Sequence, residues 1–289
     1  MSHVGVLRAL TEAGHEPDGI AGTSFGAIVA ALYALGGPLD EMERLLLAPR
    51  AREVWQQGLD FGLHRLSLVR GRRLERWLDE TLYHGATFKD LAKPLAIATT
   101  NLATGELHVA SEGSLASAVV ASCSLPLLFA PVNLGSEWLV DGGFVEAVPF
   151  RSGLGLGAQR LLGVNTGIDT EQAGMVRWLR RIRRRRWARG FANWCVERPL
   201  TGSGGRALRG LGWAARSYAR PQPVPAGAAL LRVDPGIAWW DFHRTGEAVR
   251  AGYRSTQLQL DNGLLTGLRQ LETLEVTDDP AHVAALRPG

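Results

Sequence analysis

The sequence predicts an α/β fold in which a largely parallel sheet is covered by helices on both faces. Short apolar segments of strand length alternate along the chain with helical patterns, which is typical of repeated strand–helix–strand units. The chain has 289 residues, 46% of them hydrophobic and 21% charged, which suits one large domain with a substantial core. No internal repeat accompanies this alternation.

The first hundred residues predict helices and strands in alternation. Helices are expected over residues 4–13, 27–35, 39–47 and 74–82, and strands over 19–22 and 95–100. In the first helix Val6, Leu7 and Leu10 recur at helical spacing. Gly36 and Gly37 follow the second helix and would end it. Residues 19–22 and 95–100 are short apolar runs and predict buried strands.

The rest of the chain continues the pattern. Strands are expected over residues 107–110, 138–140, 161–165 and 228–233, and helices over 115–122 and 242–253. The turn 103–106 joins two predicted strands, so that pair resembles a hairpin. Ser114 would cap the small-residue helix, and Pro126 follows its end.

Cysteine use and hydropathy favour a cytoplasmic protein. Cys123 and Cys195 provide no disulfide framework and no metal-ligand spacing, which suits a reducing compartment. No apolar run approaches the roughly 20 residues that cross a bilayer. Residues 1–8 show no basic segment followed by an apolar one, so no signal peptide is expected.

The segment Gly22-Thr23-Ser24-Phe25-Gly26 matches G-x-S-x-G. It lies between a predicted strand and a predicted helix, which is the context that this motif requires. The glycines permit a sharp turn, and the serine hydroxyl is then exposed at a helix N-terminus, where the dipole favours developing negative charge. A simple turn or helix cap is the alternative, but the flanking elements favour a nucleophile at Ser24.

The base for this serine is predicted to be an aspartate. Six histidines lie in no recognisable catalytic motif: His3, His15, His64, His84, His108 and His243. Asp141-Gly142-Gly143 follows the predicted strand 138–140, and strand carboxyl ends are where ligands gather in α/β sheets. Asp-Gly-Gly alone is an ordinary turn. Together with the serine motif, it makes Asp141 the candidate base.

Several segments, in order, resemble the patatin-like phospholipase family, particularly its bacterial members. Residues 2–10 are similar to its first helix, residues 22–26 to its nucleophile elbow and residues 141–143 to its dyad motif. Residues 99–105 and 121–126 resemble two further family segments. The resemblance implies a three-layer α/β/α sandwich with a mostly parallel central sheet.

The resemblance also implies a chemistry. Ser24 would attack a lipid or lysophospholipid ester, Asp141 would take its proton, and water would hydrolyse the acyl-enzyme without metal or organic cofactor. Gly22, Thr23, Phe25, Gly26, Gly142 and Gly143 would support the site.

One family feature is missing before Ser24. The family begins with a strand and a G-G-G-x-R-G loop that supplies oxyanion donors, and neither precedes the helix at residue 2. Each lost donor should cost roughly 10²–10³ in rate. We expect the loop to lie upstream of Met1. The alternative is a catalytically impaired adaptor.

An arginine-rich block separates two parts of the predicted domain. We expect a catalytic core over 1–170, an insertion or mobile segment over 171–227, and a C-terminal part of the same domain over 228–289. From Gln172 to Arg220 there are 13 arginines, no lysine and one acid, Glu197, a net charge of +12.

This block predicts peripheral contact with an anionic membrane, on the inner face. The candidate lipid-contacting residues are Arg180, Arg181, Arg183, Arg184, Arg185, Arg186 and Trp187. A solvated basic linker is the plainer alternative. Nucleic-acid binding is a further rival, but no nucleic-acid-binding motif accompanies the arginines.

Overall fold

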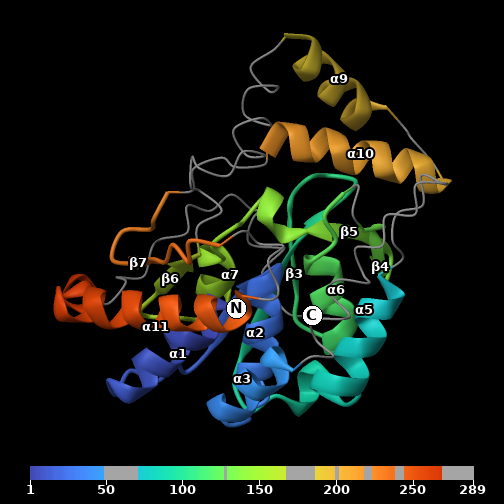
Figure 1. Ribbon diagram of the computed structural model, residues 1–289. Coiled ribbons are helices and arrows are strands. Elements are labelled where there is room, and N and C mark those ends of the chain that lie inside the picture. Colours follow the sequence, from blue (N-terminus) through green and yellow to red (C-terminus); the bar gives the residue numbers. More distant parts are fainter. Residues whose placement is uncertain are drawn as a thin grey trace.

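The computed structural model describes residues 1–48, 71–126, 129–166, 186–198, 202–217, 223–237 and 244–268 (Figure 1). The strands are β1 (Ile20–Thr23), β2 (Leu95–Asn101), β3 (Leu107–Ala110), β4 (Val132–Leu134), β5 (Glu137–Asp141), β6 (Leu162–Asn165) and β7 (Ala229–Arg232). The α-helices are α1 (Ser2–Glu12), α2 (Phe25–Ala34), α3 (Leu39–Leu47), α5 (Arg72–Trp77), α6 (Leu115–Ser122), α7 (Phe150–Gly155), α9 (Arg186–Glu197), α10 (Gly202–Ser217) and α11 (Thr245–Asp261). Shorter helical segments are the π-helix η1 (Leu78–Tyr83) and the 3₁₀ turns η2 (Phe88–Asp90), η3 (Gly142–Phe144) and η5 (Leu264–Gly267).

The α/β class is confirmed, but the main sheet is mixed rather than mostly parallel. β1 runs parallel to β2, whereas β3 and β5 run antiparallel to β2, and β4 antiparallel to β5. Short connections explain two of these three antiparallel pairs. β2 and β3 are joined by a short turn, as are β4 and β5, and strands joined by so short a loop must be antiparallel. β6 and β7 form a separate parallel pair.

Helices contact both faces of the main sheet. Leu95 and Ile97 of β2 belong to the core cluster around α2 and α6, while the alternate residues Ala96 and Ala98 are also buried. α7 packs against β1 and β2. Because side chains alternate along a strand, burial of both sets means that both faces of β2 are covered. The result is an α/β/α arrangement, as predicted.

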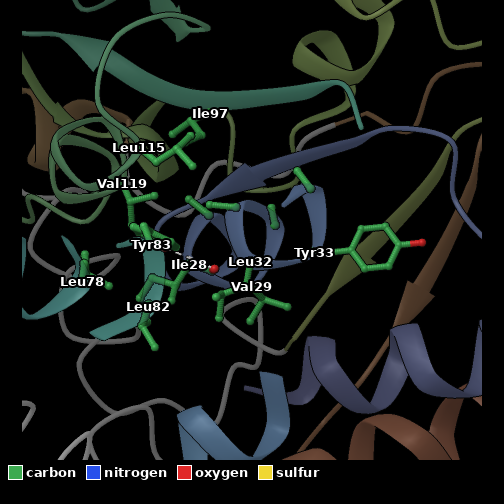
Figure 2. Close-up of a cluster of buried hydrophobic side chains, with 14 of the residues drawn as sticks. Ile28, Val29, Leu32, Tyr33, Leu78, Leu82, Tyr83, Ile97, Leu115 and Val119 are labelled. Atoms are coloured by element: carbon green, nitrogen blue, oxygen red, sulfur yellow. Dashed lines mark hydrogen bonds between the residues drawn. The ribbon is translucent and has the colours of Figure 1, made fainter. Parts of the chain in front are cut away.

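The core is centred on α2, whose residues from Ala27 to Ala34 are all buried. Figure 2 shows Ile28, Val29 and Leu32 of this helix among side chains of η1, β2 and α6. A helix that is apolar on every side has to be enclosed by other elements. α2 therefore fixes the position of its own N-terminus, where Ser24 lies.

α1 and α11 lie side by side next to the second sheet (Figure 1). They meet at two glycines: a Cβ on Gly5 would lie 1.9 Å from the carbonyl oxygen of Val249, and one on Gly252 would lie 2.0 Å from that of Ser2. Val6 of α1 packs against Leu231 of β7. α1 and α11, which lie near the two ends of the described chain, therefore pack together beside β7.

α10 packs on the end of the main sheet where β2 and β5 meet (Figure 1). Its Trp213 donates a hydrogen bond of 3.0 Å from Nε1 to the carbonyl oxygen of Leu102, and the ring covers Gly105. The predicted insertion 171–227 contains α9 and α10, and its status as an insertion stays a prediction. Within the described residues, no helix has the length and hydropathy needed to span a bilayer.

Candidate functional site

Ser24 occupies a strained turn between β1 and α2. Its backbone has φ 52 and ψ −128, outside the regions that L-residues prefer, and such conformations cost about 1–3 kcal/mol. Gly22 permits the turn, since a Cβ there would lie 2.6 Å from Cα of Ala27. Ser24 is thereby placed at the N-cap of α2.

β2 holds β1 and β5 end to end along one of its edges. Residues 20–23 pair with 95–98 in parallel, and residues 139–141 pair with 99–101 in the antiparallel direction. β3 pairs with residues 97–100, overlapping both sets, so it must occupy the opposite edge. The carboxyl ends of β1 and β5 therefore meet, with Thr23 opposite Ala98 and Asp141 opposite Thr99.

This junction brings the two predicted residues together. Ser24 Oγ donates a hydrogen bond of 2.8 Å to Oδ2 of Asp141. The other carboxylate oxygen, Oδ1, accepts the N–H of Gly143 at 2.7 Å. Asp141 is 2% exposed, while Ser24 is partly open to solvent. Ser24 is therefore the more solvent-accessible residue of the pair.

Burial dominates the electrostatics of Asp141. It raises the pKa of the carboxyl to about 6, and hydrogen bonds from Gly143 and Ser24 oppose that rise. An ionised carboxylate in this setting is a stronger base than one in water. The pair has the geometry of a hydroxyl and its proton acceptor.

Gly142, directly after Asp141, lies close against the backbone of β2. A Cβ on Gly142 would lie 2.2 Å from the carbonyl oxygen of Ala98, so only glycine fits there. Thr100 Oγ1 donates to the carbonyl oxygen of Asp141 at 2.9 Å and fixes the end of β5. Thr23 Oγ1 donates to the carbonyl oxygen of Glu146 at 2.8 Å and ties β1 to the same loop.

Histidine does not take the place of the carboxylate. In the described part of the chain, the hydrogen bonds donated by Ser24 go to Ser122 and Asp141. His3 lies beside the first turn of α2, with Nε2 3.6 Å from the position of a Cβ on Gly26. Burial lowers the pKa of its imidazole to about 3, so the ring is neutral. His64 and His243 lie outside the described residues.

Three consecutive residues at the end of α6 contact the pair, and no role was predicted for them. Ser122 Oγ accepts the N–H of Ser24 at 2.8 Å, and the carbonyl oxygen of Ser124 accepts the N–H of Asp141 at 3.1 Å. Burial and the nearby Asp141 raise the pKa of the Cys123 thiol, while a hydrogen bond with the Ser24 side chain opposes this rise. A serine within a small-residue helix has no distinctive spacing, so only the family resemblance of 121–126 pointed to this segment.

Most of the predicted lipid-contacting arginines cannot be placed. Arg180, Arg181 and Arg183–Arg185 lie outside the described residues, and Arg186 and Trp187 are placed only as backbone of α9. The glycine-rich loop expected upstream of Met1 stays a prediction. Among the described residues, no three His, Cys, Asp or Glu side chains gather as a metal site would require.

Comparison with known proteins identifies relatives of the part that carries this site. A family model described as patatin-like phospholipase matches residues 1–154. An uncharacterized NTE family protein of Mycobacterium tuberculosis is 33% identical over 149 residues, which cover 52% of this chain and 25% of that protein. The lysophospholipase nte1 of Aspergillus fumigatus is 31% identical over 169 residues, which cover 58% of this chain and 11% of that protein.

The chain thus spans a quarter or less of the length of these two relatives. Among solved structures, VipD from Legionella pneumophila matches with a TM-score of 0.48 and 16% identity, covering 90% of this chain and 64% of that chain. The relatives align with about half of the sequence.

Proposed function

The chain belongs to the patatin-like phospholipase family, and on that premise we propose that it is a lipid acyl hydrolase acting through Ser24 and Asp141. Its substrates are carboxylic esters of glycerolipids, with lysophospholipids the first class to test, since a fungal relative is named a lysophospholipase. The hydrogen bond of 2.8 Å between Ser24 Oγ and Asp141 Oδ2 is the observation that carries the proposal.

The reaction has two halves. Ser24 Oγ attacks the ester carbonyl carbon while its proton passes to Asp141 Oδ2. The tetrahedral intermediate collapses, the C–O bond to the alcohol breaks, and Asp141 returns the proton to the leaving alkoxide. Water then gives a proton to Asp141 and attacks the acyl-enzyme, and Ser24 regains its proton as the fatty acid leaves.

The environment of Asp141 supports its role as base. With a pKa of about 6, the carboxylate is ionised at neutral pH, yet it holds a proton more strongly than a carboxylate in water. A base whose pKa lies near the working pH transfers protons most effectively. No third residue is needed to orient the carboxylate, because Gly143 N–H already holds Oδ1.

The test is turnover of a short-chain aryl ester and of a lysophospholipid by wild type, Ser24→Ala and Asp141→Asn. Each variant should lose roughly 10³-fold or more in kcat, and the double variant should lose no more, because the two groups act as a unit. Full activity in Asp141→Asn would refute the assignment of the base. Full activity in Ser24→Ala would refute the proposal as a whole.

Contact with an anionic membrane is the second part of the proposal. α9 and α10 together carry five arginines and one glutamate. Trp194 of α9 is 42% exposed and Trp138 of β5 is 37% exposed. Each ring lies under a guanidinium, Arg198 at 5.5 Å and Arg206 at 3.9 Å from the ring centroids. Exposed tryptophan beside arginine suits the headgroup level of a bilayer, and contact there is peripheral.

A further inference from the structure

The junction between β1 and β5 contains one buried hydroxyl that belongs to neither strand. Ser122, the last residue of α6, is fully buried. Its Oγ accepts the N–H of Ser24 at 2.8 Å and donates to the carbonyl oxygen of Ala98 at 2.7 Å. The hydroxyl thus joins an N–H of the nucleophile's turn to the central strand.

The position of this bridge explains why a side chain is needed. Thr23 is the last residue of β1 to pair with β2, and its partner is Ala98. At Ser24 the chain leaves the strand with a positive φ. The carbonyl oxygen of Ser124, two residues beyond α6, accepts the N–H of Asp141, so the last residue of α6 and the residues after it hold both members of the pair.

α6 is a firm support for this corner. Leu115 and Val119 are fully buried in the core that surrounds α2, and Ser114 caps the helix by accepting the N–H of Ser117. Rigid packing of the supporting element limits movement of the groups that it holds. A displacement of about 1 Å at a reacting atom can cost roughly 10²-fold in rate.

We infer that Ser122 is a positioning residue, whose hydroxyl holds the backbone of Ser24 so that the nucleophile's Oγ stays on the carboxylate of Asp141. This inference rests on the proposed chemistry of Ser24 and Asp141. It assigns Ser122 no contact with substrate.

Replacing Ser122 with alanine removes one oxygen atom and leaves the N–H of Ser24 and the carbonyl oxygen of Ala98 without this partner. We expect kcat on a short-chain ester to fall by roughly 10- to 100-fold while KM changes by less than about twofold. The apparent pKa in the pH profile of kcat/KM should also rise, because the hydrogen bond from Ser24 that lowers the pKa of Asp141 is weakened.

Ser152→Ala is the matched control. Ser152 is 1% exposed, and its hydroxyl donates to Glu146 Oε2 at 2.6 Å, so this variant also loses one buried hydrogen bond. It should keep the kcat and pH profile of wild type even if its Tm falls. Ser122→Thr keeps the hydroxyl and should recover most of the lost kcat. Ser122→Cys keeps the volume but offers only weak hydrogen bonds, and it gives an intermediate kcat if the alanine variant does not fold.

The outcomes separate this inference from the proposed function. If Ser24→Ala is inactive and Ser122→Ala and Ser122→Cys match Ser152→Ala in kcat and pH profile, Ser122 has no positioning role and only this inference fails. If Ser24→Ala keeps full turnover, the proposed function fails and this inference with it. A low kcat, a shifted pH profile and recovery by threonine support it.

Discussion

At the scale of single residues, the site depends on the carboxylate of Asp141, whose charge costs free energy to bury. Asp141 is 2% exposed and receives two hydrogen bonds, yet its pKa is still raised to about 6. The folded protein therefore binds a proton at this group more tightly than the unfolded chain does. The contribution of Asp141 to the free energy of unfolding is fully present below the pKa that this carboxyl has in the unfolded chain. That contribution is lost as the pH rises through the folded-state pKa of about 6.

Asp141→Asn should consequently be inactive but more stable than wild type at pH 8. The asparagine can accept from Gly143 and donate to Ser24, so both contacts survive without a buried charge. A shift of two pKa units corresponds to about 3 kcal/mol, which sets the scale of the gain. Urea unfolding at pH 8 and pH 4 tests this, and the gain should shrink at the lower pH. A variant less stable than wild type at pH 8 would contradict the account.

At the scale of elements, the register of β2 sets the distance between the two residues. β1 and β5 approach each other along one edge of β2, and their ends lie opposite neighbouring residues, Ala98 and Thr99. A slip of either strand would separate Ser24 from Asp141. The close approach of Gly142 to Ala98 is therefore part of the site.

Gly142→Ala tests this register. The added Cβ would lie 2.2 Å from the carbonyl oxygen of Ala98 and would push β5 away from β2. We expect a loss of about 3 kcal/mol in the free energy of unfolding and a large loss of activity. Gly37→Ala is the control, since a Cβ there meets nothing within 4 Å. Wild-type activity in Gly142→Ala would show that the register tolerates movement.

The second element-scale prediction concerns Trp194 of α9 and the arginine block that includes the start of this helix. Trp194→Ala should weaken binding to vesicles that contain anionic lipid by about tenfold, because a ring of this size contributes roughly 1.5 kcal/mol or more when buried. Replacing Arg183–Arg186 with glutamine should weaken it further and reduce its dependence on salt. Soluble short-chain esters should be hydrolysed as before. Vesicle co-sedimentation with and without anionic lipid provides the measurement.

Leu258→Ala is the matched control for this experiment. Leu258 of α11 is 63% exposed, and it lies on a helix remote from α9. Its loss should leave vesicle binding unchanged. Equal binding of wild type to neutral and anionic vesicles would identify the arginine block as a solvated basic segment.

At the scale of the whole molecule, local patterns predicted elements well and their arrangement less well. The predicted helices 39–47 and 115–122 and the strand 107–110 have the bounds of α3, α6 and β3, because periodicity and capping are local properties. β4 and its short connection to β5 were not predicted, and neither was the antiparallel pairing of β5 with β2. The predicted hairpin of β2 and β3 is confirmed, whereas the mostly parallel sheet was wrong at β5, which runs antiparallel to both β2 and β4.

For the candidate site too, local motifs predicted residues but not their arrangement. Ser24 and Asp141 could be selected because each stands in a short motif at a strand end. Their separation could not be predicted, since it depends on the pairing of both strands with β2. Ser122 and Trp213 were not singled out, because each acts through a contact that only the folded chain brings together.

The central claim is that Ser24 forms a covalent bond to the acyl group with Asp141 as its base. The most direct measurement is mass spectrometry of the protein quenched during turnover of a slowly hydrolysed ester, followed by peptide mapping of the adduct. The account predicts an acyl group on Ser24 in wild type and little or none in Asp141→Asn, where proton removal fails. Ester hydrolysis with the adduct on another residue, or an equal rate of acylation in Asp141→Asn, would contradict it.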